Sequence, residues 1–316
     1  MATLDADAER VLDLIRQSGR PPYETLAPAE ARELYRKGRT VLQPDPPDVA
    51  EVSDLSAAGA TGPIRLRRYR GAGTNPYRPV PGLIYFHGGG WVFGDLDTHD
   101  VVCRKIANAA GLIVIAVDYR LAPEAKFPAA VEDSIAATDW IAENARALGV
   151  DRERLALGGD SAGGEVAAVA ALAARDSGGP RLRHQLLLYP AVDLAMTHES
   201  HRRITEGLPL THTTMRWFRD HYLRSPADQH DWRASPLRRA GDLRGLPPAY
   251  VLTVGFDPLC SEGEAYARAL SAAGVPTEHR HLERQMHGFL TMGRIIAEAE
   301  PAILAAAAAV KRAVVT

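Results

Sequence analysis

Residues 155–166 read LALGGDSAGGEV, and this stretch decides the fold. Its centre, Gly159–Gly163, matches the pattern G-x-S-x-G, in which a serine occupies a tight turn between a strand and a helix. The apolar run at 155–157 is typical of a buried strand, and an alanine-rich segment of helical period follows at 162–175. Such a turn strains the serine backbone, and small neighbours leave room for it. The stretch therefore predicts that Ser161 lies at the end of a strand as a candidate nucleophile.

A phosphate-binding loop is the alternative interpretation of the same glycines. Both Gly158–Gly163 and Gly159–Gly164 have the spacing G-x-x-x-x-G, but a phosphate loop continues with lysine and then serine or threonine. Here Glu165 and Val166 follow. A carboxylate in the place of the ammonium group would repel a phosphate, so the sequence argues against nucleotide binding.

Outward from this stretch, short apolar runs alternate with alanine-rich segments of helical period. The runs expected to be strands are 64–69, 83–86, 112–117, 155–157, 186–189 and 250–254. The segments 129–147 and 262–273 are further expected helices. Unbroken apolar runs of this length suit strands that are buried on both faces. The alternation predicts an α/β protein with a mostly parallel sheet between two layers of helices.

Two parts of the chain lie outside this alternation. An amphipathic helix is expected over 8–17, and a second from Pro28 to Gly38, because proline is frequent at helix starts and glycine at helix ends. Residues 191–245 contain several large aromatic residues and no clear strand. An insertion after a strand end would lie at the ligand-binding edge of the sheet, where it would form a lid.

Composition limits the possible functions. The chain has 316 residues, which allows two domains or one large domain with an insertion. Apolar residues make up 46% and charged residues 24%, as in globular proteins. The net charge of −2 argues against a nucleic-acid partner. The two cysteines, Cys103 and Cys260, cannot supply paired zinc ligands, so no metal is expected; we expect reduced thiols, although a disulfide stays open.

The ends of the chain predict neither a signal peptide nor a membrane span. Residues 1–10 include three acidic side chains and no apolar stretch. The longest apolar run near the C-terminus, 303–310, is far shorter than the ~20 residues that cross a bilayer. We therefore expect a cytoplasmic protein.

A serine nucleophile needs a base, and the base needs an acid to orient it. In the strand–serine–helix architecture the chain order is serine, acid, histidine. His279 and His281 fall in 277–282, which alternates like a strand, so they are expected to be ordinary sheet residues. His287 follows this segment, and Gly288 permits a tight loop beside it. The sequence favours His287 as the base.

The acid is expected at the carboxyl end of a strand, where catalytic groups collect in α/β sheets. Asp257 follows the apolar run 250–254, and Pro258 fits the start of a helix. Glu262 and Glu264 are the nearest rivals, but their helical placement predicts that they are solvated. Asp257 is the better candidate.

A glycine-rich segment, His87-Gly88-Gly89-Gly90-Trp91, follows the expected strand 83–86. Consecutive glycines leave backbone N–H groups uncovered, and aligned N–H groups can bind the oxyanion of a tetrahedral intermediate. A merely flexible turn is the alternative. The ordered serine, acid and base favour an oxyanion hole, and His87 is expected to order the loop rather than to transfer protons.

Taken together, these motifs resemble the hormone-sensitive-lipase-like branch of the α/β-hydrolases, the bacterial family IV carboxylesterases. The motifs that carry the resemblance are 87–91, 119–124 (YRLAPE), 159–164, 257–259 and 287–289. The resemblance covers nearly the whole chain and implies an α/β-hydrolase fold with a helical cap. It implies a catalytic domain of residues 46–190 and 246–316, and a cap of residues 1–45 and 191–245.

The resemblance also implies the site and its activity. The implied triad is Ser161, Asp257 and His287, and the implied oxyanion donors are the N–H groups of Gly88, Gly89 and Ala162. Residues expected to line the acyl pocket are Trp91, Leu210, Trp217, Phe218 and Leu290. The implied activity is hydrolysis of short- to medium-chain acyl esters through an acyl-enzyme, without a cofactor, and many members form homodimers.

Three residues depart from the pattern of the family. Glu165 stands where asparagine is frequent, and Cys260 and Ser261 stand where arginine and aspartate are frequent. We hypothesise that Glu165 pairs with an arginine. We expect the polar network around Asp257 or the cap to differ.

Other functions on the same scaffold stay open to different degrees. Receptors that resemble this family lack a working histidine, so His287 argues against a binding protein. A peptidase or amidase would share the triad, although nothing resembles the propeller domain of the large peptidases. A lactonase or an enzyme that removes acetyl groups from sugars is chemically close and stays open.

Overall fold

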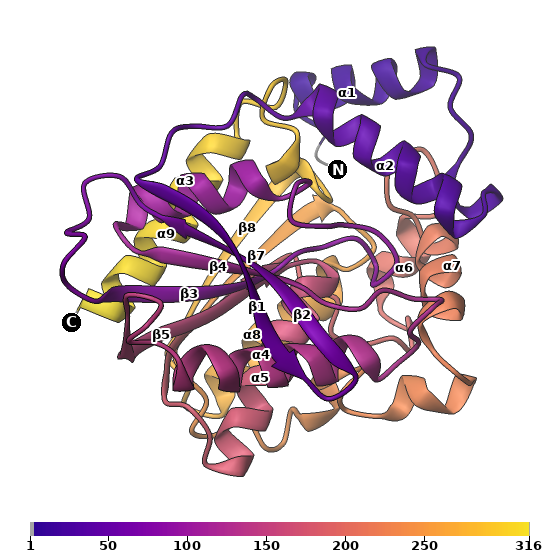
Figure 1. Cartoon of the computed structure of the whole chain (residues 1–316). Helices are drawn as coiled ribbons and strands as arrows, with labels where there is room; N and C mark the ends of the chain where they lie inside the picture. Colours follow the sequence, from indigo (N-terminus) through magenta and orange to yellow (C-terminus); the bar gives the residue numbers. More distant parts are fainter. Residues whose placement is uncertain (1–2, 316) are drawn as a thin grey trace.

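An eight-stranded sheet forms the centre of the protein in the computed structural model, which describes residues 3–315 (Figure 1). The strands are β1 (Glu51–Gly59), β2 (Gly62–Arg70), β3 (Val80–Phe86), β4 (Ile113–Asp118), β5 (Val150–Asp160), β6 (Leu182–Leu188), β7 (Ala249–Phe256) and β8 (Thr277–Met286). Their order in the sheet is β1-β2-β4-β3-β5-β6-β7-β8. β2 is antiparallel to β1 and β4, and all other neighbours are parallel. The predicted mostly parallel α/β sheet is confirmed.

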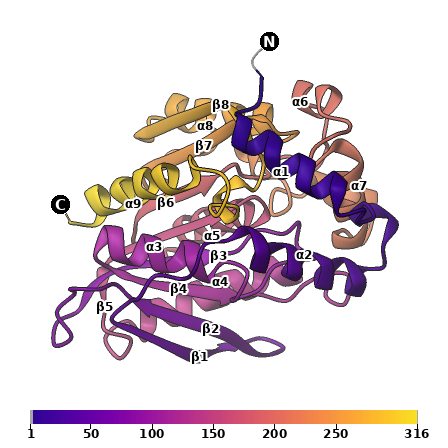
Figure 2. The same ribbon diagram turned by 90° about the horizontal axis from the view of Figure 1, so that it is seen from above.

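Helices cover both faces of the sheet (Figure 2). They are α3 (Asp100–Ala110) and α9 (Ala299–Val315) on one face, and α4 (Ala129–Glu143), α5 (Ala162–Ser177) and α8 (Cys260–Ala272) on the other. Within β3, Ile84 and Phe86 belong to the cluster on the α4 and α5 side, while Leu83 and Tyr85 belong to the cluster on the α3 and α9 side. Burial on both faces explains the unbroken apolar runs.

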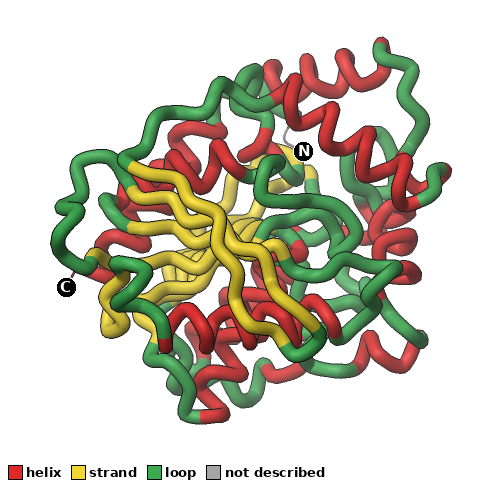
Figure 3. Tube along the Cα trace, in the orientation of Figure 1, coloured by secondary structure: helices red, strands yellow, loops and turns green. Residues whose placement is uncertain are grey.

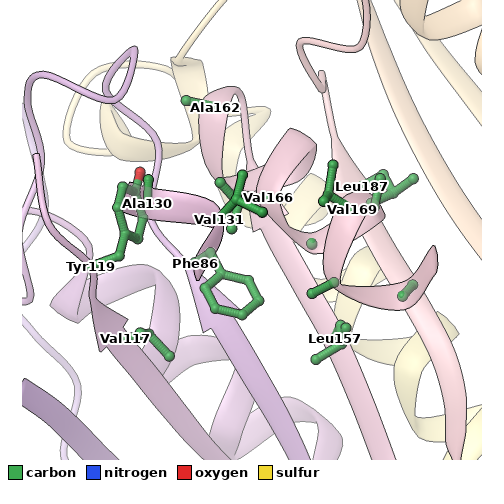
Figure 4. Close-up of a cluster of buried hydrophobic side chains, with 14 of the residues drawn as sticks. Phe86, Val117, Tyr119, Ala130, Val131, Leu157, Ala162, Val166, Val169 and Leu187 are labelled. Atoms are coloured by element: carbon green, nitrogen blue, oxygen red, sulfur yellow. The ribbon is translucent and has the colours of Figure 1, made fainter. Parts of the chain in front are cut away.

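The cluster on the α5 side packs helix against sheet (Figure 4). Phe86 and Leu157 of the sheet and Val166 of α5 are all fully buried there. Close packing of this kind fixes the start of α5, because Val166 lies only five residues after Ser161. The core thereby positions the turn that carries the candidate nucleophile.

Several elements differ from expectation, among them α3 and α9, which the apolar pattern did not predict. α2 (Pro28–Leu42) continues past Gly38, so the predicted end of this helix is wrong. It ends where Gln43, with an extended ψ of 145°, precedes Pro44, since a residue before proline is disfavoured in a helix. β1 was not expected, because most of its residues are exposed or half-buried and it lies at the edge of the sheet.

The remaining helices gather beyond the carboxyl ends of the parallel strands (Figures 1 and 3). α1 (Ala6–Gln17) and α2 precede the sheet in sequence, whereas α6 (Glu199–Arg203) and α7 (His212–Tyr222) belong to the insertion 191–245. Short 3-10 helices occur at Tyr23–Thr25, Pro226–His230, Pro236–Arg239 and Phe289–Thr291. Thr214 of α7 donates to Glu24 at 3.1 Å, which connects the two groups.

Cys103 and Cys260 are buried free thiols, so the expectation of reduced cysteines agrees with the structure. Among the helices of residues 3–315, none is both long and apolar enough to cross a membrane.

Candidate active site

Ser161 lies in the sharp turn between β5 and α5, with φ 57° and ψ −120°. This is a region that residues other than glycine rarely occupy. The turn approaches β3 so closely that a Cβ atom at Gly159 or Gly163 would overlap the carbonyl oxygen of Phe86. The glycines of the G-x-S-x-G stretch are therefore required by the contact between the turn and its neighbouring strand.

The structure brings three residues from distant parts of the chain into contact at this turn. His287 Nε2 is 2.9 Å from Ser161 Oγ, and His287 Nδ1 is 2.7 Å from Asp257 Oδ2. Asp257 follows β7, and its Oδ1 accepts the N–H of Leu259 at 2.8 Å. Asp257 is fully buried, while Ser161 and His287 are 8% and 9% exposed. The hydroxyl is thus reachable from solvent while the carboxylate is shielded.

The rival residues take other roles. His279 and His281 lie on β8 and both contact Thr253 Oγ1 at 2.9 Å, as expected of sheet residues. Glu262 is not solvated, so that prediction is wrong. It is fully buried and accepts from His201 Nε2 at 2.9 Å.

Glu262 also accepts the N–H groups of Val192 and Asp193, at 2.7 and 3.1 Å. Burial raises the pKa of Glu262, although His201 and these two amides favour its charged form. Helical periodicity could not reveal this role, because the partners come from the insertion 191–245. The contacts attach the start of that insertion to α8.

Asp160, which directly precedes Ser161, was not singled out from the sequence. Its Oδ1 accepts the N–H of Gly88 at 3.0 Å and the hydroxyl of Tyr85 at 2.9 Å, and His99 Nε2 lies 3.3 Å from the carboxylate. Burial opposes ionisation, but His99 and these hydrogen bonds lower the pKa of Asp160 to about 2. A charged Asp160 therefore ties the glycine-rich loop to the serine turn.

This contact corrects the predicted oxyanion donors. The N–H of Gly88 is occupied by Asp160, and Gly88 does not line the cavity above Ser161, whereas Gly89 and Gly90 do. Within residues 3–315, the N–H groups of Gly89, Gly90 and Ala162 donate to no protein acceptor. The structure thus replaces Gly88 by Gly90 in the candidate set of donors.

Glycine is needed at positions 89 and 90 because of the backbone conformation there. Gly89 and Gly90 have φ values of +125° and +60°. A Cβ atom at Gly90 would overlap the ring of Phe218, and one at Gly89 would overlap the carbonyl of Phe93. Glycine is the residue that tolerates such positions.

His87 orders the loop, as expected. Its ring stacks on Tyr119 with centroids 4.4 Å apart, and the Tyr119 hydroxyl donates to the His87 carbonyl at 2.6 Å. Burial and the nearby His99 lower the pKa of His87 to about 4, so the ring is neutral at pH 7. A neutral, buried ring is suited to holding the loop.

A cavity of about 500 Å³ opens above Ser161 and His287. Its far walls are apolar residues of α1 and α2, such as Val11, Ile15 and Leu34. Of the residues predicted to line it, the structure places Leu210 and Phe218 there.

Three predicted pocket residues lie outside the cavity. Trp91 is fully buried and stacks on Tyr222, with centroids 4.4 Å apart. Trp217 packs against Phe93 and Phe218, while Leu290 is buried in the core on the α9 side. Their apolar surfaces are used in packing, so the pocket prediction is corrected for these positions.

Glu165 does not pair with an arginine. Its Oε2 accepts the indole N–H of Trp91 at 2.9 Å, and its Oε1 has no hydrogen-bond partner within the described residues. Burial raises the pKa of Glu165 well above its ordinary value, against the smaller opposing effect of the Trp91 hydrogen bond. The carboxyl group has an indole N–H and no cation as its partner among the described residues, so our hypothesis of an arginine partner is wrong.

The other two departures lie at the start of α8. The N–H of Ser261 donates to Ser200 Oγ at 3.1 Å, which joins α8 to α6. Cys260, Glu264 and His281 bring possible metal-ligand atoms within 4.8 Å of one another. Burial raises the pKa of the Cys260 thiol to about 12, so the thiol is protonated and a poor ligand by itself.

A parallel α/β sheet that presents a serine, a histidine and an aspartate at its carboxyl edge defines the class of protein as an α/β hydrolase. A model of the alpha/beta hydrolase fold family matches residues 83–291. The chain belongs to this family, in its hormone-sensitive-lipase-like branch.

Named relatives agree with this assignment. The chain is 46% identical to the carboxylic ester hydrolase LipN of Mycobacterium tuberculosis over 296 residues, which cover 92% of this chain and 78% of LipN. It is 38% identical to the ethyl acetate hydrolase of Pseudomonas putida over 314 residues, 96% of each chain. A serine-to-alanine variant of LAE6, an alpha/beta hydrolase enzyme from the metagenome of Lake Arreo, Spain, superimposes with a TM-score of 0.96 at 42% identity, covering 100% of both chains.

Proposed function

We propose that the protein is a serine carboxylesterase that hydrolyses short- to medium-chain acyl esters through an acyl-enzyme. The observation that carries the proposal is the line of contacts from Ser161 Oγ through His287 to Asp257, at 2.9 and 2.7 Å. The relatives named carboxylic ester hydrolase and ethyl acetate hydrolase support the same reaction class.

In the first half of the reaction, Ser161 Oγ attacks the ester carbonyl while His287 Nε2 accepts the hydroxyl proton. Asp257 accepts a hydrogen bond from Nδ1–H, which fixes the tautomer and stabilises the imidazolium without taking its proton. His287 then donates the proton from Nε2 to the departing alcohol, and the acyl group stays on Ser161. In the second half, water attacks the acyl-enzyme with the same assistance and releases the acid.

The N–H groups of Gly89, Gly90 and Ala162 bind the oxyanion in both halves. Gly89 and Gly90 line the cavity together with Ser161, and Ala162 directly follows Ser161. The three N–H groups have no protein acceptor within residues 3–315. Donors that are already oriented in a shielded site stabilise the developing charge without reorganisation. Asp160 contributes by holding the adjacent Gly88 N–H, at 3.0 Å.

The size of the cavity supports the proposed range of esters. A volume of about 500 Å³ lies within the usual range for small-molecule sites. Each buried methylene of the acyl chain contributes about 0.8 kcal/mol until the cavity is filled. We expect kcat/KM to rise from acetate towards medium-chain p-nitrophenyl esters and to fall for the longest chains.

The test is Ser161→Ala with p-nitrophenyl butyrate as substrate. We expect turnover to be lost while the circular dichroism spectrum and melting temperature stay close to the parental values. The p-nitroanilide of the same acid distinguishes an esterase from an amidase, since an amidase would hydrolyse both. Hydrolysis of the ester by Ser161→Ala at the parental rate would exclude the assignment.

The proposal also includes a cellular location and an oligomeric state for the protein. Buried free thiols at Cys103 and Cys260 support a reducing, cytoplasmic location. The outer edge of β8 pairs with no strand of residues 3–315, and such an edge supports a homodimer. Cell fractionation and light scattering after size exclusion test the two statements.

A further inference from the structure

Arg39 places a positive charge in the cavity beside the proposed base. It lies on α2 and lines the cavity together with Ser161 and His287. Its Nη2 is 3.6 Å from the position that a Cβ atom on Gly288 would occupy, and Gly288 directly follows His287. The guanidinium is therefore close to the reacting groups.

The other arginines in the same stretch of α2 are paired with carboxylates. Arg32 contacts Glu124 at 2.6 Å, and Arg36 contacts Asp95 at 3.0 Å. For Arg39, no carboxylate of the described residues lies within 4.0 Å. Its Nε is buried and has no hydrogen-bond partner among them.

Tyr35 contacts the guanidinium of Arg39 but does not occupy all of its N–H donors. Its guanidinium carbon lies 4.6 Å from the centroid of the Tyr35 ring. The ring contributes a cation–π interaction, and a single tyrosine cannot satisfy all five N–H donors of a guanidinium. Arg39 is half-buried, and a cation whose buried Nε–H has no acceptor is less favourable than a paired one until an acceptor binds.

The cavity supplies no such acceptor of its own. Asp160 is the one carboxylate among its lining residues in the described part of the chain. The carboxylate of Asp160 is engaged by Gly88, Tyr85 and His99. Two other cations line the cavity, but Arg20 contacts the Tyr23 hydroxyl at 2.7 Å and Lys37 contacts Glu33 at 3.3 Å. We therefore expect the acceptor for Arg39 to come with the ligand.

We propose that Arg39 forms a carboxylate-binding subsite and that the preferred substrates are esters that carry a carboxylate on the acyl or the alcohol part. This inference rests on the proposed esterase function. A planar guanidinium binds a carboxylate through two parallel N–H···O hydrogen bonds, which a flexible ammonium cannot reproduce. Arg39 is thus a specificity residue, whereas the line of contacts through Ser161 performs the reaction.

The test compares esters that differ in charge but are similar in length. For the acyl part, the pair is mono-p-nitrophenyl glutarate and p-nitrophenyl hexanoate. For the alcohol part, the pair is γ-acetoxybutyrate and pentyl acetate. In Arg39→Gln, we expect the ratio of kcat/KM for charged over neutral ester to fall about 10- to 100-fold in one of the two pairs, as for loss of a hydrogen-bonded charge pair. The pair that responds identifies which part of the ester carries the carboxylate.

Arg36→Gln is the matched control, since it removes the same charge from the same helix outside the cavity. We expect its charged-to-neutral ratio to equal that of the parent. Arg39→Lys retains the charge without the planar pair of donors, so an intermediate ratio is expected. Higher ionic strength should lower the ratio in the parental enzyme. If Arg39→Gln does not fold, the ratio in Arg39→Lys decides the question.

The outcomes separate the two proposals. If the parental enzyme hydrolyses the neutral esters but the ratios are the same in the parent and Arg39→Gln, the carboxylate subsite is refuted and the esterase function stands. A parental ratio that is insensitive to ionic strength also counts against the subsite. If the parental enzyme hydrolyses none of the four esters, the proposed function itself fails.

Discussion

The floor and the roof of the cavity are built differently. The floor consists of Ser161 and His287, which line the cavity, and we include in it the buried Asp257 behind them. All three follow strands of one sheet and are joined by hydrogen bonds of 2.7 and 2.9 Å. The roof consists of α1 and α2, which face the cavity mainly with apolar side chains and with Lys37 and Arg39. We therefore expect the floor to determine the reaction and the side chains of the roof to determine which ester is accepted.

Asp257→Asn should produce the largest effect, because it alters the floor without removing any atom from the packing. An amide cannot hold the imidazole in the required tautomer, and in other serine hydrolases this change lowers kcat by about 10⁴-fold. Steady-state hydrolysis of p-nitrophenyl butyrate measures it. Asp151→Asn, which alters a carboxylate that contacts Arg154 at 2.7 Å, is the control and should stay near the parental rate. A loss below about tenfold in Asp257→Asn would contradict the role of the floor.

Gly90→Ala tests the corrected oxyanion donors. The added methyl group would overlap the ring of Phe218 at a φ of +60°, so the N–H of residue 90 must move. Loss of one such donor lowers kcat by about 10²- to 10³-fold. Gly73→Ala is the control, since Gly73 also has a positive φ, +75°, but lies in open space. If both variants retain parental kcat, the amide of Gly90 does not bind the oxyanion.

Gly38→Leu tests the roof. Gly38 lines the cavity, and nothing lies within 4 Å of the position of a Cβ atom there. A leucine side chain should fill space that an acyl chain would use. We therefore expect kcat/KM for p-nitrophenyl octanoate to fall about tenfold relative to kcat/KM for the acetate ester. A tenfold loss corresponds to the contribution of nearly two buried methylenes. Gly38→Ala should change this ratio less and should stabilise α2 by up to about 1 kcal/mol. Equal losses on both esters would indicate damage to the floor instead.

Glu165→Gln should have the smallest effect and concerns stability. The raised pKa of Glu165 means that the native protein keeps a proton that the unfolded chain releases above its ordinary pKa of 4.5. Stability is then lost as pH rises from that value towards the folded pKa, and glutamine has no proton to lose.

Urea unfolding at acid and at mildly alkaline pH measures this difference. Relative to the parent, Glu165→Gln should become more stable on going to the higher pH. Glu283→Gln changes an exposed carboxylate and should show no such gain. The same pH dependence in the parent and in Glu165→Gln would show that Glu165 is ionised in the native protein.

The sequence was sufficient for the elements that repeat a simple pattern. Apolar runs located the buried strands, and the order of Ser161, Asp257 and His287 located the residues that the structure brings together. It was insufficient where a side chain from one element decides the role of another. The use of the Gly88 N–H depends on the orientation of Asp160, and the burial of Glu262 depends on a helix that packs against it from the insertion.

The roles of large aromatic residues likewise depend on neighbours that the sequence does not reveal. Trp91 and Trp217 were expected to line the acyl pocket, because the sequence does not distinguish the wall of a cavity from the core beside it. The partner of Glu165 is an indole N–H, at 2.9 Å, which no charge pattern predicts. Tyr189, whose ring lies 4.7 Å from that of His287, lies in the expected segment 186–189, yet only the fold places it beside the base.

The most direct test of the central claim is covalent labelling of the active-site serine. The parental protein is treated with diisopropyl fluorophosphate, and peptide mass spectrometry locates the adduct while residual esterase activity is followed in the same sample. We predict one adduct, on Ser161, whose yield rises in proportion to the activity lost, and no adduct in Ser161→Ala. Complete labelling of Ser161 with activity retained, or inactivation by an adduct elsewhere, would contradict the account.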